Sequence, residues 1–282
     1  VDAAVATGFA LAVTYPEAGN LGGGGFMTLY VSGKPYFLDY RETAPAAASA
    51  DMYLGKDGEP VEGLSLFGNL AAGTPGTVRG LAMAHQRFGK LPWARVLAPA
   101  VRYAREGFLV NAQFAGMLTS EVPPQFSRTN FRDYFGPRKA GAMFKQPELA
   151  ATLERIAKGG DKAFYEGKTA DLIVAQMQRG PVKGLITKAD LANYKAVWRT
   201  PVTARWRGHD VITAPPPSSG GVALMQMLLM KQDLAPTFKG VALNSPRYIH
   251  LLAEIEKRVY ADRAEYLGDP DFVKVPVTNL ID

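Results

Sequence analysis

Arg41 has the side-chain chemistry needed to bind an acidic small molecule. Its guanidinium group is planar and permanently charged, so it can hold a carboxylate through two parallel hydrogen bonds. It directly follows the run FMTLYVSGKPYFLDY at residues 26–40. The alternative is a solvated ion pair with the neighbouring Asp39 or Glu42, which would contribute little to stability. Arg41 is therefore a candidate clamp for an acidic substrate.

Two local features would position Arg41. Residues 26–40 alternate in polarity around a short loop containing Gly33, which predicts a β-hairpin that ends next to Arg41. Four consecutive glycines, residues 22–25, precede the hairpin. Glycine has no side chain, so such a run suits a place where the main chain passes close to another chain or a ligand. The antiparallel hairpin also argues against a doubly wound parallel sheet.

Other candidate sites do not fit the patterns their chemistry requires. The glycines at residues 19–25 match neither dinucleotide-binding nor phosphate-loop spacing. Ser218 and Ser219 lack the G-x-S-x-G elbow of a serine nucleophile and are better explained as a helix cap. The histidines lack zinc-site spacing, and the aspartates around Pro270 are typical of a turn, so we expect no metal and no cofactor; these residues are His85, His209, His250, Asp269 and Asp271.

Composition indicates a packed globular protein. Hydrophobic residues make up 47% of the 282 residues and charged residues 21%. The net charge is +6, but the densest basic cluster falls in a strand-like run, where a solvated strand face explains it better than a nucleic-acid site; the cluster contains Trp198, Arg199, Arg205, Trp206 and Arg207. We therefore expect no nucleic-acid partner. The chain has no cysteine, which excludes disulfides and thiolate chemistry but leaves the compartment open.

The pattern of elements predicts an α+β protein formed as a single unit over residues 1–282. Helices are expected at 1–15, through much of 76–194, at 220–230 and at 245–268, and strands at 201–206 and 210–213. Thr187 lies three residues before Asp190, a typical helix start. The last helix carries an apolar stripe that we expect in the core: Ile249, Leu252, Ile255 and Val259. The apolar run at 5–13 is too short to span a membrane.

Several motifs, taken in order, make the chain similar to the γ-glutamyltransferase family. The first are GNLGGGGF at 19–26 and RETAP at 41–45. They are followed by TPGTVRG at 74–80, HQRFGKLPW at 85–93, PPPSSGG at 215–221, YADR at 260–263 and LGDP at 267–270. The resemblance runs from end to end. Its strength lies in the ordered set, because no single glycine motif is specific.

The resemblance implies a fold and indicates which subunit carries the catalytic nucleophile. The fold would be the four-layer αββα sandwich of the N-terminal-nucleophile hydrolases. Members are made as a precursor that cleaves itself, and the nucleophile is the N-terminal threonine of the small subunit. This chain would then be the large subunit of a heterodimer, truncated at both ends, with no catalytic nucleophile of its own. Its partners would be the small subunit, glutathione or another γ-glutamyl donor, and an amino-acid, peptide or water acceptor.

Within that resemblance, Arg41 matches the arginine that binds the donor carboxylate. We expect it in a site shielded from water, with Glu42 and Thr43 supporting it. The resemblance also implies a periplasmic or secreted protein. Two alternatives stay open: a same-family acylase for glutaryl-β-lactam or poly-γ-glutamate substrates, and a non-catalytic protein that binds acidic small molecules.

Overall fold

The computed structural model describes residues 1–121 and 124–282, which divide into two compact units. The first contains Val1–Gly25 and Tyr40–Ala196, and the second contains Phe26–Asp39 and Val197–Asp282. The chain therefore crosses between the units on both sides of the predicted hairpin. That residues 1–282 form a single unit stays a prediction.

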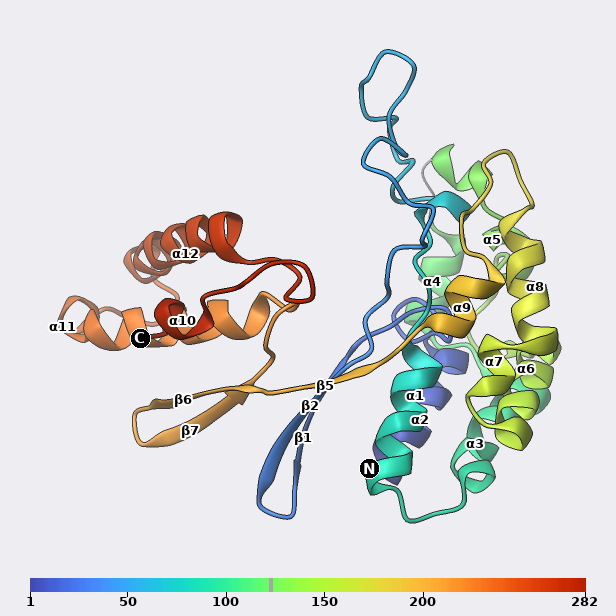
Figure 1. Cartoon of the computed structure of the whole chain (residues 1–282), viewed down its shortest axis with the longest axis horizontal. Helices are drawn as coiled ribbons and strands as arrows, with labels where there is room; N and C mark the ends of the chain where they lie inside the picture. Colours follow the sequence, from blue (N-terminus) through green and yellow to red (C-terminus); the bar gives the residue numbers. More distant parts are fainter. Residues whose placement is uncertain (122–123) are drawn as a thin grey trace. The chain divides into compact units, whose positions relative to one another are not determined.

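The first unit is mainly helical, as the sequence predicts (Figure 1). Two short strands, β3 (Phe108–Leu109) and β4 (Met143–Phe144), pair within it. Two 3-10 helices cover Asn69–Ala71 and Pro124–Arg128. The α-helices are α1 (Asp2–Thr14), α2 (Thr77–Phe88), α3 (Trp93–Glu106), α4 (Ala112–Thr119), α5 (Phe131–Tyr134), α6 (Pro147–Gly159), α7 (Lys162–Tyr165), α8 (Gly167–Met177) and α9 (Lys188–Asn193).

Helix α3 lies at the centre of this unit, where both α1 and α6 pack against it. Its first residue, Trp93, meets Phe9 of α1 edge to face, with ring centroids 5.5 Å apart. The indole N–H of Trp93 donates to the carbonyl oxygen of Ile156 in α6 at 2.9 Å. Fully burying a side chain such as Phe9 or Ile156 stabilises a fold by about 1.5–3 kcal/mol. This packed core fixes the helices between which the surface loops of the first unit run.

The second unit contains the hairpin and the last part of the chain. Its strands are β1 (Phe26–Val31), β2 (Lys34–Asp39), β5 (Val197–Arg199), β6 (Val202–Trp206) and β7 (His209–Thr213). Its helices are α10 (Gly220–Asp233), α11 (Ala235–Phe238), α12 (Pro246–Tyr266) and α13 (Val277–Leu280). The three-stranded sheet has the order β1-β2-β5, and β6 pairs with β7 in a second hairpin. Helices α10 and α12 lie side by side (Figure 1).

Strands β1 and β2 form the hairpin that the sequence predicts, with Lys34 already in the return strand opposite Val31. Phe26 lies opposite Asp39, and the strands turn at Ser32 and Gly33, whose φ angles are 51° and 77°. Two residues with positive φ form the tight turn that matches the twist of paired strands. The pairing extends past the hairpin, because the N–H of Tyr40 donates to the carbonyl oxygen of Gly25 at 2.9 Å. Arg41 therefore comes directly after the last paired residue.

Two expectations about the second unit need correction. The apolar stripe of α12 is only partly core: Ile255 is buried, but Ile249 is 57% exposed, since α10 covers only part of the helix. Helix α10 begins directly after the predicted serines, and the Ser218 hydroxyl accepts the N–H of Gly220, its first residue, at 3.3 Å. The N-cap residue Ser219 makes no capping hydrogen bond, and its hydroxyl accepts a hydrogen bond from the Arg263 side chain at 3.2 Å instead. A contact with α12 has thus taken over one of the two side chains that the local pattern assigns to a cap.

Candidate functional site

Arg41 lies on the segment 41–46, which leaves the β2 strand and runs along the first unit. The carbonyl and N–H of the preceding Tyr40 pair with Gly25, so the start of this segment is fixed by the end of the hairpin ladder. The Arg41 side chain is exposed. The residue is exposed in this chain because the segment lies at the surface once it leaves the sheet, so the expected shielding from water stays a prediction about the assembled enzyme.

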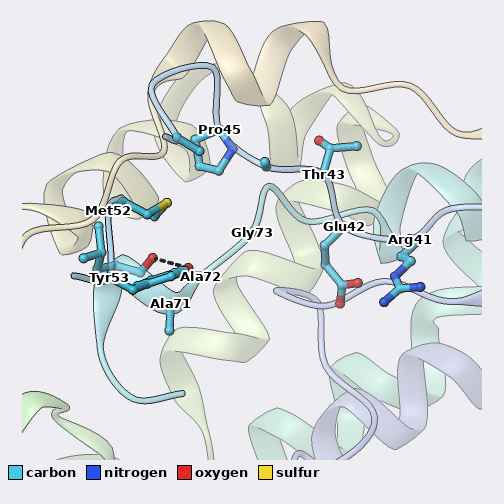
Figure 2. Close-up of a pocket in the computed structure, with 12 residues that line it drawn as sticks. Arg41, Glu42, Thr43, Pro45, Met52, Tyr53, Ala71, Ala72 and Gly73 are labelled. Carbon is cyan, nitrogen blue, oxygen red and sulfur yellow. Dashed lines mark hydrogen bonds between the residues drawn. The ribbon is translucent and has the colours of Figure 1, made fainter. Parts of the chain in front are cut away.

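A cavity of about 270 Å³ lies beside this segment. Figure 2 shows Arg41 and Glu42 at one end of it, with Met52 and Tyr53 at the other. Among the described residues that line the cavity, Arg41 alone is basic and Glu42 alone is acidic. The volume is near the lower limit for a small-molecule site, which suits an amino-acid-sized group better than a large cofactor. The remaining described lining residues are Thr43, Ala44, Pro45, Ala48, Leu70, Ala71, Ala72 and Gly73.

The glycine run packs directly against the main chain around Arg41. A Cβ atom added to Gly24 would lie 2.5 Å from the carbonyl oxygen of Tyr40 and 2.7 Å from the amide nitrogen of Glu42. Real side chains do not make such contacts with backbone, so only glycine fits there. The glycines do allow a close main-chain approach at Gly24. The backbone approached is this chain's own, at Tyr40 and Glu42, and not that of another chain or a ligand.

Three hydrogen-bonded contacts hold the segment on its other sides. The backbone of Thr43 exchanges two hydrogen bonds with Thr74, at 2.8 and 3.2 Å. The hydroxyl of Tyr194 donates to the carbonyl oxygen of Arg41 at 2.8 Å. The N–H of Ala46 donates to Oδ1 of Asp190, also at 2.8 Å. The main chain of the segment is thus tied down from one end to the other.

The helix that supplies two of these contacts begins as the sequence predicts. Thr187 and Asp190 form a complete capping box at the start of α9, with each side chain bonded to the other residue's backbone N–H. Burial raises the pKa of Asp190, but the hydrogen bonds from Thr187 and Ala46 outweigh it and lower this pKa overall. The cap pattern identified the helix start. It carried no signal that the same carboxylate binds Ala46.

A second polar cluster lies in the second unit and was missed from the sequence. The Nε of Arg199 donates to Asp39 at 2.7 Å, and its two terminal nitrogens hold Asp271 at 2.7 and 2.9 Å. The Arg199 side chain is 15% exposed, so the interpretation of the basic run as a solvated strand face is wrong at this residue. It holds for Arg205, which is 73% exposed. The hydrogen bonds from Arg199 keep the pKa of Asp271 below its usual value.

The described residues offer no metal cluster and no membrane-spanning helix, and the described lining of a larger apolar cavity lacks a basic residue. Among the described residues, no three His, Cys, Asp or Glu side chains converge as metal ligands would. Within the same part of the chain, no helix has the length and apolar character to cross a membrane. A larger cavity of about 620 Å³ has mostly apolar walls that include Phe126 and Phe131. None of its described lining residues is basic, so an acidic ligand fits the Arg41 cavity better.

Comparisons with known proteins agree with this picture over the whole chain. A family model described as gamma-glutamyltranspeptidase matches residues 1–282. A glutathione hydrolase proenzyme from Pseudomonas aeruginosa is 64% identical over 282 residues, covering 100% of this chain and 50% of that protein. An acylase ACY 1 proenzyme from Pseudomonas sp. (strain V22) is less similar, at 36% identity over 293 residues, covering 100% of this chain and 52% of that protein. This chain thus spans about half the length of these curated relatives.

The fold is that of a solved relative. The gamma-glutamyltranspeptidase of Pseudomonas nitroreducens, solved in complex with L-DON, superposes with a TM-score of 0.96 at 60% identity. The match covers 100% of this chain and 83% of that one. It confirms the predicted fold class, the α+β fold of the N-terminal-nucleophile hydrolases.

Proposed function

Because this chain belongs to the gamma-glutamyltranspeptidase family, we propose that it is the large-subunit part of a glutathione hydrolase or γ-glutamyltransferase. The enzyme would remove the γ-glutamyl group from glutathione and related compounds and pass it to water or to an amine. The observation that carries the proposal is a family match over all 282 residues, with Arg41 as the basic residue of the small cavity.

The proposed reaction is acyl transfer through a covalent intermediate. The hydroxyl of the N-terminal threonine of the small subunit attacks the γ-carbonyl carbon of the donor. Its proton passes to the α-amino group of the same threonine and then to the departing amine as the C–N bond breaks. Water or an amine acceptor releases the glutamyl group from the threonine. The nucleophile lies outside these 282 residues.

In this scheme the present chain binds and orients the donor. The guanidinium of Arg41 holds the donor α-carboxylate, which places the γ-carbonyl near the nucleophile and makes the attack effectively intramolecular. Glu42 and Thr43 follow it directly, and the backbone hydrogen bonds of Thr43 with Thr74 support the position of the main chain. Since Arg41 is exposed here, its shielding from water comes from the other subunit.

The small subunit from the same precursor is the proposed partner. The relative from P. aeruginosa is named a proenzyme, which supports processing of a precursor. Among the described residues, the outer strands β1 and β5 of the three-stranded sheet each pair only with β2, so both edges of the sheet are open to another strand. The large exposed apolar side chains include Leu243 and Phe272, at 73% and 86%. An open strand edge and exposed apolar side chains suit burial against a second polypeptide.

We further propose that the mature enzyme is periplasmic or secreted, as the family resemblance implies. Cell fractionation of a strain expressing the complete gene tests this directly. Activity should appear in the periplasmic extract or the medium together with a periplasmic marker. Activity that stays with a cytoplasmic marker would contradict it.

Donor preference tests the proposed reaction. The complete precursor should be purified after cleavage and given γ-glutamyl-p-nitroanilide and glutaryl-p-nitroanilide in parallel, with glutathione as a third donor. We expect turnover of both γ-glutamyl donors, and a lower kcat/KM for the glutaryl compound. A preference for the glutaryl donor or for poly-γ-glutamate would favour the acylase alternative. Binding of glutathione without any turnover of these donors would favour the non-catalytic alternative.

A further inference from the structure

The position of the Arg41 side chain depends on a main-chain segment that has no regular secondary structure of its own. Apart from its bridge to Thr74, the segment 41–46 is irregular, and it lies at the surface of the first unit. An irregular surface segment is normally mobile, because few contacts restrain it. A guanidinium that must meet a carboxylate with two hydrogen bonds needs a well-defined origin. The residues that restrain this segment are therefore of functional interest.

Tyr194 restrains the segment at Arg41 itself. Its side chain is buried, and its hydroxyl donates to the Arg41 carbonyl oxygen at 2.8 Å across 153 positions of sequence. Its ring stacks on Tyr165 with centroids 5.8 Å apart and planes 6° from parallel. A Cβ atom on Gly76 would collide with both the Tyr194 hydroxyl and the Tyr40 carbonyl. The hydroxyl is thus held in place by close packing on several sides.

The stacking partner of Tyr194 is itself immobilised. Tyr165 is 1% exposed, and its hydroxyl donates to the carbonyl oxygen of Pro75 at 3.0 Å. The same hydroxyl accepts the backbone N–H of Arg79 at 3.1 Å. The Arg79 guanidinium lies 4.4 Å from the centre of the Tyr165 ring and pairs with Asp161. The restraint on Arg41 therefore continues into the helical core of the first unit.

Asp190 restrains the other end of the segment from the same short helix. Its Oδ1 accepts the Ala46 N–H at 2.8 Å, while its Oδ2 accepts the N–H and hydroxyl of Thr187 at 2.8 and 2.6 Å. Helix α9 runs from Lys188 to Asn193, and Tyr194 is its C-cap residue. Helix α9 and its C-cap residue thus contact both ends of the segment that carries Arg41.

We propose that α9 is a clamp for the segment 41–46, in which Tyr194 and Asp190 are positioning residues that set the origin of the Arg41 side chain. The inference rests on the proposed function, because it assigns these residues a role in donor binding through Arg41. Neither residue touches the donor. Their loss should weaken recognition of the donor carboxylate and leave the chemical step nearly unchanged.

The main test uses Tyr194→Phe in the complete, cleaved enzyme. This change removes one hydroxyl and keeps the stacked ring. Because a single intramolecular hydrogen bond has a modest net value, we expect KM for γ-glutamyl-p-nitroanilide to rise about two- to tenfold, with kcat nearly constant. A purely structural role would instead reduce the amount of active enzyme, which lowers the apparent kcat and leaves KM unchanged. Tyr248→Phe, which removes a hydroxyl bonded to Lys231 in the second unit, is the matched control and should change neither.

A second pair of variants separates the clamp from the helix cap. Thr187→Ala and Asp190→Ala both destroy the capping box of α9, but only Asp190→Ala also removes the acceptor for Ala46. We expect a larger rise in donor KM for Asp190→Ala. Equal KM values for the two variants would show that Asp190 acts only as a helix cap. The positioning role of Asp190 would then be overturned, and only that of Tyr194 would stand.

A double-mutant cycle with Arg41→Ala decides the inference. If Tyr194 acts through Arg41, Tyr194→Phe should have no further effect on KM once Arg41 is alanine. Additive effects, or an unchanged KM for Tyr194→Phe beside a large effect of Arg41→Ala, would overturn the clamp and leave the role of Arg41 standing. Near-wild-type kinetics for Arg41→Ala would overturn both. The two failures are therefore distinguishable.

Discussion

The strength with which Arg41 can bind a carboxylate depends on how much water reaches its guanidinium group. An exposed pair between an arginine and a carboxylate contributes at most about 1 kcal/mol, because solvent screens the charges and both side chains lose freedom. The side chain is exposed in this chain. The same guanidinium would bind a carboxylate far more strongly once water is excluded. Under the proposed function, Arg41 would supply the hydrogen bonds and charge for donor recognition, and its environment in the assembled enzyme would supply the strength of binding.

Replacing Arg41 in the complete enzyme should impair donor recognition severely. Arg41→Ala leaves the donor carboxylate without its partner in a site shielded by the small subunit, which should cost about 2–5 kcal/mol. In kcat/KM this is roughly thirtyfold to several thousandfold. Arg41→Lys should recover only part of the lost kcat/KM, because lysine keeps the positive charge but cannot form the two parallel hydrogen bonds of a guanidinium group. Steady-state kinetics on cleaved enzyme measures both; changes within about 1 kcal/mol for either variant would indicate a surface ion pair.

Gly24 offers a test of the close main-chain approach. Gly24→Ala would place a methyl group against the backbone of Tyr40 and Glu42, and forcing an extra carbon into a packed region costs about 1–3 kcal/mol. Gly22→Ala is a matched control from the same run, since its nearest neighbour would be the Asn20 side chain at 3.6 Å. Denaturant unfolding of the complete protein measures both. Equal stabilities for the two variants would show that the contact at Gly24 is not restrictive.

At the scale of elements, the Arg199 cluster links the sheet to the loop after α12. Arg199 lies on β5, Asp39 ends β2 two residues before Arg41, and Asp271 belongs to the loop. Asp39 is 7% exposed, whereas the Asp271 side chain is 55% exposed. The cluster therefore has a buried half within the sheet and a half open to solvent.

The cluster predicts an acid-dependent contribution to stability. Hydrogen bonds from Arg199 keep the pKa of Asp271 below its usual value of 3.8. A depressed carboxylate pKa means that the stabilising contribution is fully present above pH 3.8 and is lost as the pH falls through the lower, folded-state pKa. Asp271→Asn should thus be less stable than wild type near neutral pH, and the difference should shrink in acid. Asp210→Asn is the control. The Asp210 side chain is 78% exposed and lies as far as 3.7 Å from the Arg205 side chain, so this ion pair should contribute little to stability.

The measurement is the free energy of unfolding of the complete protein as a function of pH. The wild-type and Asp271→Asn curves should converge below pH 3.8, whereas Asp210→Asn should follow wild type throughout. Parallel curves for wild type and Asp271→Asn down to the acid limit would contradict the proposed ion pair.

At the scale of the whole molecule, the chain should depend on its partner. Both edges of the three-stranded sheet are open among the described residues, and large apolar side chains such as Phe272 are exposed. We expect residues 1–282 purified alone to be inactive towards γ-glutamyl donors and to lack the cooperative unfolding transition of the full complex. Calorimetry and a donor assay check this. Turnover by the isolated chain, or a transition like that of the complex, would contradict it.

The sequence by itself determined the local elements and the family. Apolar periodicity, the Thr187 cap and the glycine turn at residue 33 predicted helices and hairpins, because each signal acts between residues that are near in the chain. The ordered motifs indicated the family, and the family resemblance indicated Arg41 as the candidate residue for binding the donor carboxylate. No local pattern indicated what Tyr194 or Arg199 would contact.

Tertiary structure alone decided those partners. The Tyr194 hydroxyl reaches Arg41 across 153 positions, and Arg199 reaches Asp39 across 160 and Asp271 across 72. It also decided that Arg41 is exposed and that Ile249 lies outside the core. A side chain's partners and burial depend on which distant segments pack against it, and a short stretch of sequence records only its own preferences. For this reason the candidate clamp could be recognised only once the chain was folded.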